Sequence, residues 1–218
     1  MEKEMVGPIA FVYPIPIVLI GSMVAGKANF AEIGDCALAG INPALVVVSI
    51  NENHYTTFGI REHRCFSLNF PTTQRLKAVD YCGNHSGKEV DKSTLFEIEP
   101  GQNPLCPLIA EFPVNLECEV IHDHQIEHRH LYVAKVTQTH IAKNLISREK
   151  GKIHFPDLRM LDPILTAWTT PITRWGKRLE HQALNAIKNS ETKRRNRFTV
   201  KCRKNREPSE LLRLIKRF

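Results

Sequence analysis

The sequence of 218 residues lacks the features that mark several common classes of protein. Its six cysteines include no C-x-x-C pair, so neither a zinc site nor a disulfide framework is indicated, and a reducing compartment is the simpler interpretation. Aromatic residues make up only 7% of the chain, whereas proline occurs 13 times, which favours short strands and turns over long helical bundles. No apolar run reaches membrane-spanning length, because Pro14 and Pro16 interrupt the one near the N-terminus. We therefore expect one main cytoplasmic domain.

The positive charge of the chain is concentrated at its C-terminal end. The formal net charge is +7, but residues 192–218 contain 11 of the 30 Lys and Arg residues and only 2 of the 23 acidic residues. This segment is therefore +9 and residues 1–191 are −2, so the basicity belongs to a tail and not to the body of the protein. We predict a domain over residues 1–190 and a basic C-terminal tail over residues 191–218.

Short β-branched runs bounded by turn residues predict strands. Residues 44–50 and 65–70 are almost entirely apolar, as in strands that are covered on both faces. Residues 113–122 alternate between apolar and polar side chains, which predicts a half-buried strand, and residues 131–141 supply its antiparallel partner. After a further run at 15–20, Ala25-Gly26-Lys27 predicts a turn that folds the chain back towards Asn29.

Helices are predicted only as short elements between these strands. Residues 56–62 and 72–81 each follow residues that can begin a helix. A third helix over residues 173–189 has one apolar stripe, which is typical of a docking face. Many short strands with small helices between them indicate a closed or partly closed barrel rather than a doubly wound sheet.

A polar turn leads from the run at 44–50 into the first predicted helix. It reads His54-Tyr55-Thr56-Thr57. The start of a helix presents unpaired backbone N–H groups and a partial positive charge, so a phosphate can bind there with help from the Thr hydroxyls and His54. From these four residues alone, an ordinary capped helix is the alternative.

A second polar segment, residues 82–92, follows the next predicted helix. Its glycines allow the backbone to approach a ligand closely, Ser86 offers a hydroxyl, and Lys88 and Lys92 supply positive charge for an anion. Asp91 could orient one of the lysines. By itself the pattern also fits an ordinary surface turn.

Taken together and in order, these segments resemble the flavin reductase-like family, including its flavoredoxin type. The resemblance covers about residues 8–170. It implies a mainly β fold, a six-stranded antiparallel Greek-key split β-barrel with a few short helices, usually a homodimer with FMN near the subunit interface. The segments that carry it are PIVLIG at 16–21, GKANF at 26–30, NPALVVVSI at 42–50, HYT at 54–56, FSLNFP at 66–71 and SGKEVDK at 86–92.

The resemblance also implies which residues hold the cofactor. The Gly-Lys-Ala-Asn loop and the segment after it would line the isoalloxazine ring, residues 49–57 would hold the ribityl chain and phosphate, and residues 86–92 would close over the cofactor. The FMN-binding set carried over in this way is Asn29, Phe30, Ala31, Ser49, Asn51, His54, Tyr55, Thr56, Ser86, Gly87 and Lys92. Because the flavin itself supplies the chemistry, no catalytic acid or nucleophile is required.

The function implied is that of an FMN-dependent oxidoreductase. It would be an NAD(P)H-dependent flavin reductase or an electron-transfer protein of the flavoredoxin type, with NAD(P)H or a redox protein as electron donor. No G-x-G-x-x-G motif follows a predicted strand, so a nicotinamide would have to bind shallowly over the flavin.

Three further patterns have two interpretations each. The basic tail, with a possible amphipathic helix over residues 209–218, could bind nucleic acid or an anionic membrane surface, or could be a flexible solvated extension. Cys82 could touch the flavin or be a buried, inert thiol. One histidine cluster could bind a metal ion or form a polar hairpin, and we assign no metal to it; its members are His122, His124, His128 and His130.

Overall fold

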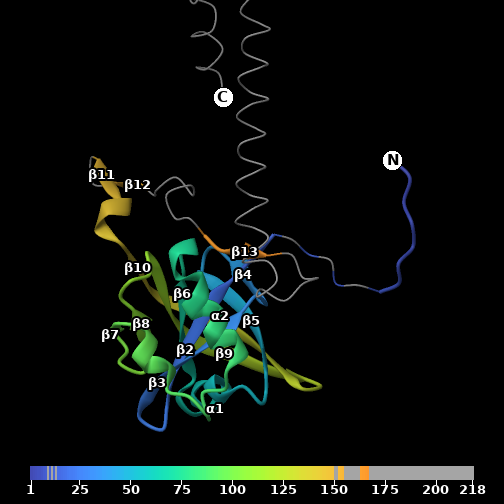
Figure 1. Cartoon of the computed structure of the whole chain (residues 1–218). Helices are drawn as coiled ribbons and strands as arrows, with labels where there is room; N and C mark the ends of the chain where they lie inside the picture. The colour runs from blue at the N-terminus through green and yellow to red at the C-terminus, as the bar shows by residue number, and fades with distance from the viewer. Residues whose placement is uncertain (9, 11, 13, 150–151, 155–162, 167–218) are drawn as a thin grey trace, which may run out of the picture. The chain divides into compact units, whose positions relative to one another are not determined.

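The structure is a computed structural model that describes residues 1–8, 10, 12, 14–149, 152–154 and 163–166. One antiparallel sheet of seven strands dominates these residues, in the order β3-β2-β6-β9-β10-β5-β4 (Figure 1). The predicted mainly β architecture is confirmed, with one strand more than the six expected. The strands are β2 Val18–Val24, β3 Lys27–Ile33, β4 Cys36–Gly40, β5 Leu45–Asn51, β6 Cys65–Phe70, β9 Val114–Ile126 and β10 Arg129–Ile141.

Smaller elements surround this sheet. Three two-stranded sheets pair β1 with β13, β7 with β8 and β11 with β12. Their bounds are β1 Ile15–Pro16, β13 Leu165–Thr166, β7 Ile98–Pro100, β8 Pro107–Ile109, β11 Ser147–Glu149 and β12 Lys152–His154. The helices are α1 Tyr55–His63 and α2 Leu76–Asn84, and the 3₁₀ turns are η1 Thr73–Arg75, η2 Lys92–Leu95 and η3 Lys143–Leu145.

The core is a single apolar cluster inside the curled sheet. Its buried members come from α1 and from six of the seven strands, all except the edge strand β4. In β5 only alternate residues, Val46, Val48 and Ile50, belong to the core, so the prediction that residues 44–50 are covered on both faces was wrong. The residues between them are half-buried. Strand β6 is buried on both faces over Cys65–Asn69, as predicted.

The predicted turn after β2 is confirmed as a two-residue hairpin. Ala25 and Gly26 both have positive φ, 50° and 77°, as a type I′ turn requires, and this turn matches the twist of the strands it joins. Val24 therefore pairs with Lys27, and Asn29 lies opposite Ser22. The hairpin and α1 lie at the same end of the sheet (Figure 1).

Strand β9 differs from its prediction over its first residues. Asn115 and Glu117 were expected on a solvent-exposed face, but both are buried. The segment from β7 to β8 covers this face. Asn115 Nδ2 donates to the Ile109 carbonyl at 3.1 Å, and Glu117 accepts from the backbone N–H groups of Gln102 and Asn103. The antiparallel pairing of β9 with β10 is confirmed.

The two short helices predicted between strands are confirmed, the second as η1 followed by α2. Three other predictions, namely the helix over residues 173–189, the domain boundary at residue 190 and the tail over residues 191–218, lie outside the described residues. Within the described part of the chain, no helix is both long and apolar enough to cross a membrane.

Candidate functional site

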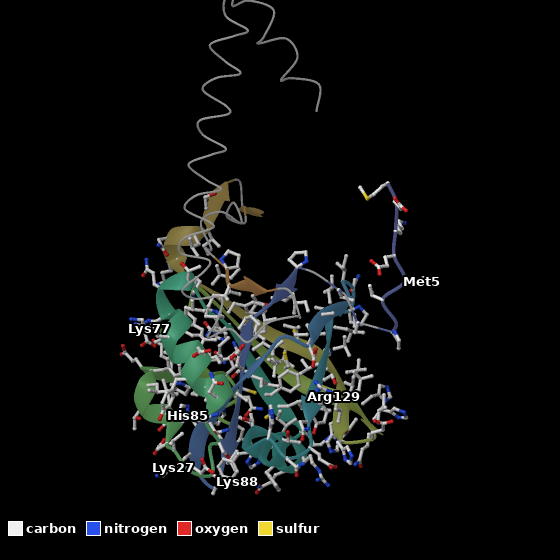
Figure 2. The ribbon with its side chains drawn as sticks, turned by 45° about the vertical axis from the view of Figure 1, so that its right-hand side comes forward. Met5, Lys27, Lys77, His85, Lys88 and Arg129 are labelled. Carbon is white, nitrogen blue, oxygen red and sulfur yellow. The ribbon has the colours of Figure 1, made fainter. Side chains whose placement is uncertain are left out.

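Two adjoining hollows lie where the β2–β3 hairpin, the start of α1 and the segment between α2 and η2 meet. The first has a volume of about 250 Å³ and the second about 350 Å³, and they share Asn29, Tyr55, Gly87 and Lys92. Figure 2 shows Lys27, Lys88 and His85 at this end of the molecule. The first hollow, called the pocket below, is lined by Asn29, Ala31, Glu32, Asn53, His54, Tyr55, Thr56, Cys82, Gly83, Asn84, His85, Ser86, Gly87 and Lys92.

Most residues of the predicted binding set come together here. Eight of the eleven line the pocket, from three segments that are far apart in the sequence: Asn29, Ala31, His54, Tyr55, Thr56, Ser86, Gly87 and Lys92. Phe30 does not line it. Its ring is fully buried and packs edge-on against Phe96, with ring centroids 5.7 Å apart.

Ser49 and Asn51 also lie outside the lining. Ser49 Oγ accepts from Arg129 Nε at 2.8 Å. Asn51 holds the turn into α1, because its side-chain oxygen accepts from the Asn53 N–H at 2.9 Å and its carbonyl accepts from Thr57 Oγ1 at 2.9 Å. The contacts of Asn51 therefore fix the geometry of the strand-to-helix turn, whereas Ser49 joins β5 to Arg129 on β10.

A buried hydrogen bond and a close backbone approach shape the centre of the site. Asn29 Nδ2 donates to Thr56 Oγ1 at 2.7 Å, and both side chains are buried. A Cβ atom on Gly87 would lie only 2.0 Å from Asn29 Oδ1 and 2.8 Å from Tyr55 Cδ1. Glycine is therefore required at position 87 if these side chains are to keep their places.

The start of α1 is suited to an anion. Its N-cap residue, His54, makes no side-chain capping bond, and the first turn contains no acidic residue. The N–H groups of this turn and the positive end of the helix dipole are thus not neutralised by a side-chain cap. Because His54, Tyr55 and Thr56 all line the pocket, the nine-residue helix begins at its wall.

A buried cation adds to this field. The Lys92 side chain is only 4% exposed, and its Nζ donates to the Cys82 carbonyl at 2.7 Å. It makes no ion pair with any acidic residue in the described part of the chain. Burial lowers the pKa of Lys92. Burial, followed by the charges of Lys92 and Arg129, lowers the pKa of His54, so an anion in the pocket would stabilise both cations.

Sequence patterns missed several residues of this site. Glu32 follows Ala31 on β3 and lines the pocket, but nothing in its local sequence marks it. Arg129 does not line the pocket, but its charge contributes to lowering the pKa of His54. It lies opposite Asn51 because β10 pairs with β5, and such a long-range register has no local signal. Cys82 lines the pocket as a buried thiol whose pKa burial raises to about 11, which favours the inert interpretation.

The histidine cluster forms part of the β9–β10 hairpin. His130 is buried, and its Nδ1 lies 2.7 Å from Asp123 Oδ1, whereas the His128 ring is exposed and contacts Glu52 at 3.3 Å. Among the residues with described positions, no three His, Cys, Asp or Glu side chains are placed to bind one metal ion. Local hydrogen bonds therefore account for these two rings.

Comparisons with known proteins agree with this arrangement. A family model described as flavin reductase like domain matches residues 11–156. The chain is similar to a flavoredoxin from Methanosarcina acetivorans, with 35% identity, 78% of this chain and 92% of that chain covered, and a TM-score of 0.70. A flavoredoxin of Desulfovibrio vulgaris (Miyazaki F) is 26% identical, with 77% and 90% covered and a TM-score of 0.68.

A third similar structure is an FMN-binding protein from Thermus thermophilus. It is 23% identical, with 72% of this chain and 95% of that chain covered and a TM-score of 0.59, and at this identity it supports the fold alone. With these neighbours, the split-barrel class expected from the sequence is confirmed.

Proposed function

The chain belongs to the flavin reductase-like family, and from this premise we propose that it binds FMN in the pocket and acts as an oxidoreductase. It is either an NAD(P)H-dependent flavin reductase or an electron-transfer protein of the flavoredoxin type. One observation carries the proposal: the buried ammonium of Lys92 and the uncapped start of α1 face one pocket, and Lys92 forms no ion pair with an acidic residue in the described part of the chain. A phosphate group is the ligand chemistry that matches both.

The two hollows together have the size of a cofactor site. Their volumes of about 250 and 350 Å³ bring the site into the range that small-molecule pockets occupy, ~300–1,000 Å³. Lys92, His54 and the first N–H groups of α1 would hold the phosphate, and β3 around Asn29 would line the isoalloxazine ring. When bound, FMN accepts and donates the reducing equivalents, while the protein fixes its orientation.

Replacing Lys92 with methionine is expected to weaken FMN binding about 10- to 100-fold, which corresponds to the loss of one charge-assisted hydrogen bond worth ~1.5–3 kcal/mol. Thr56→Ala removes the hydroxyl that Asn29 contacts at 2.7 Å and should weaken binding in the same direction. Fluorescence titration with FMN measures both. Lys77→Met is the matched control, because Lys77 is exposed on α2 and outside both hollows.

The Lys92→Met variant should also be at least as stable as the parent protein, because burial penalises the charged lysine that it removes. If Lys92→Met loses FMN affinity without losing thermal stability, Lys92 acts in binding the ligand and not in stabilising the fold. Unchanged FMN affinity in both Lys92→Met and Thr56→Ala would show that the FMN phosphate does not bind at this position.

The electron donor separates the two forms of the proposal. If the protein is a flavin reductase, anaerobic NADH or NADPH should bleach the visible absorption of the FMN-loaded protein directly. If it is an electron-transfer protein, the flavin should stay oxidised with either nucleotide and become reduced only when a reduced redox protein is added. A flavin that none of these donors reduces would contradict both forms.

We also propose that the protein forms a homodimer and that it is located in the cytoplasm, which is a reducing compartment. Among the described residues, no strand pairs with the outer edge of β4, and Leu38 on this strand is 69% exposed. Exposed apolar edges tend to be covered by another chain. Light scattering that gives the mass of a single chain would refute the dimer.

The five cysteines in the described part of the chain are unpaired, which supports a reducing environment.

A further inference from the structure

We propose that Glu32 and Asp80 form a carboxyl pair in the wall of the pocket that retains one proton, carried by Glu32, and that protonated Glu32 donates a hydrogen bond to an uncharged acceptor on the ring of the bound flavin. The inference rests on the proposed function for the identity of the ligand. It gives the site two kinds of binding group. Lys92 and the start of α1 favour an anion, whereas a carboxylic acid favours a neutral carbonyl or ring nitrogen.

The first observation is the position of the Glu32 carboxyl group. Glu32 lines the pocket from β3 and packs directly on the backbone of α2. A Cβ atom on Gly83 would lie 2.1 Å from Glu32 Oε2 and 3.3 Å from Glu32 Cβ. Only a glycine leaves room for the carboxyl group against the helix, so the side chain is held at the junction of β3 and α2.

The second observation is the carboxyl group of Asp80, which lies one helical turn from Gly83 on α2. Asp80 precedes Gly83 by three residues on α2, a spacing that puts both on one side of the helix, and its charge acts on Glu32. Asp80 Oδ1 is buried and has no hydrogen-bond partner among the described residues. Because this buried oxygen has no donor to offset its charge, two carboxylates here would repel each other, and a proton retained on Glu32 removes that repulsion.

The cations nearby do not neutralise the pair. Besides Glu32, the titratable groups that line the pocket are Cys82, whose charge interacts with that of Glu32, Lys92, whose ammonium donates to the Cys82 carbonyl, and His54, Tyr55 and His85. Neither Glu32 nor Asp80 forms an ion pair in the described part of the chain. The pair can therefore lower its charge only by retaining a proton.

The electrostatics agree with this geometry. Burial, and then the charge of Asp80, raise the pKa of Glu32 from 4.5 to about 7. Between these two values the folded protein holds a proton that the unfolded chain has released. A ligand that accepts the Glu32 O–H keeps that proton in place, so binding takes up protons near neutral pH, and affinity falls as the pH rises through about 7.

The test compares FMN binding by the parent protein and by Glu32→Gln between pH 6 and pH 8. Calorimetry in two buffers of different ionisation enthalpy gives the number of protons taken up. Glutamine keeps a hydrogen-bond donor at every pH but cannot ionise. The ratio of parent to Glu32→Gln affinity should fall about tenfold across this range, and the extra proton uptake should be absent from the variant.

The difference between the two proteins cancels the titration of the FMN phosphate and of His54, which they share. Glu62→Gln, an exposed carboxyl on α1 outside both hollows, is the matched control and should behave as the parent protein. Asp80→Asn should shift the proton uptake to lower pH, because the neighbouring charge is gone. Equal pH dependence in the parent protein and Glu32→Gln would overturn the inference.

A ligand-free measurement separates this inference from the proposed function. In urea unfolding without FMN, the parent protein should lose stability relative to Glu32→Gln as the pH rises from 5 to 8, because the folded state must give up the Glu32 proton that it binds more tightly than the unfolded chain. If FMN fails to bind but this difference appears, the pair stands and the flavin assignment fails. If FMN binds and the difference is absent, the pair fails and the flavin site stands.

Discussion

Replacing Gly87 with alanine is expected to lower FMN affinity by about 100-fold or more while the protein remains folded. The added methyl group would lie 2.0 Å from Asn29 Oδ1 and 2.8 Å from the Tyr55 ring, so both side chains must move. Their movement breaks the 2.7 Å bond from Asn29 to Thr56 and fills the space that the two hollows share. The loss of a buried hydrogen bond and of space for the ligand together account for a loss of ~3 kcal/mol or more in binding free energy.

The backbone at Gly87 does not by itself oppose this substitution, since Gly87 is not among the residues with positive φ. The effect should therefore appear in FMN titrations far more strongly than in thermal unfolding. Gly40→Ala is the matched control: it also creates a close contact, 3.1 Å from the Pro43 carbonyl oxygen, but on the edge strand β4 away from the pocket. Parent-like FMN affinity in Gly87→Ala would show that the ligand binds elsewhere.

The largest effect on stability is expected for Glu117→Ala, a loss of about 3 kcal/mol in the free energy of unfolding. Glu117 is 1% exposed and accepts from the backbone N–H groups of Gln102 at 2.9 Å and Asn103 at 2.8 Å. His140 Nε2 lies 2.6 Å from the same carboxyl group. Alanine leaves two N–H groups without their acceptor beneath a covering loop, at ~1–3 kcal/mol each.

Urea unfolding at neutral pH measures this loss. Glu119→Ala is the control, because Glu119 is exposed two residues along the same strand and should change stability by no more than ~0.5 kcal/mol. Burial tends to raise the pKa of Glu117, but the hydrogen bonds from Asn103, His140 and Gln102 outweigh it and hold the pKa below its usual value. The contribution of Glu117 is therefore present above pH 4.5 and is lost as the pH falls through the lowered pKa. Equal losses in the two variants would contradict the anchoring role of Glu117.

The parts of the fold with local causes could be predicted from the sequence. The turn at Ala25 and Gly26 depends on two adjacent residues, and the start of α1 follows directly from a buried strand and a polar turn. Both are found where they were expected. The burial of Glu117 could not be predicted in this way, because the segment that covers it forms only three-residue strands whose pairing depends on distant residues.

The residues of the candidate site also divide into those with a local sequence signal and those that depend on distant contacts. His54, Tyr55, Thr56, Gly87 and Lys92 lie in two polar segments that the sequence marks locally. Each segment by itself also fitted an ordinary capped helix or surface turn, and the resemblance to the family assigned these residues to the cofactor. Glu32 enters the pocket only because α2 folds back onto β3 at Gly83, and no pattern near Glu32 encodes that contact. Alternation along β3 could not have excluded the ring of Phe30, because Glu32, two residues further along the strand, lines the pocket.

The most direct test of the flavin pocket is a titration of the purified full-length chain with FMN, followed by visible absorption and by quenching of flavin fluorescence. We predict saturable binding of one FMN per chain, with a yellow protein that keeps its colour through gel filtration. A colourless protein that leaves the absorption and fluorescence of added FMN unchanged would contradict the assignment of this pocket to a flavin.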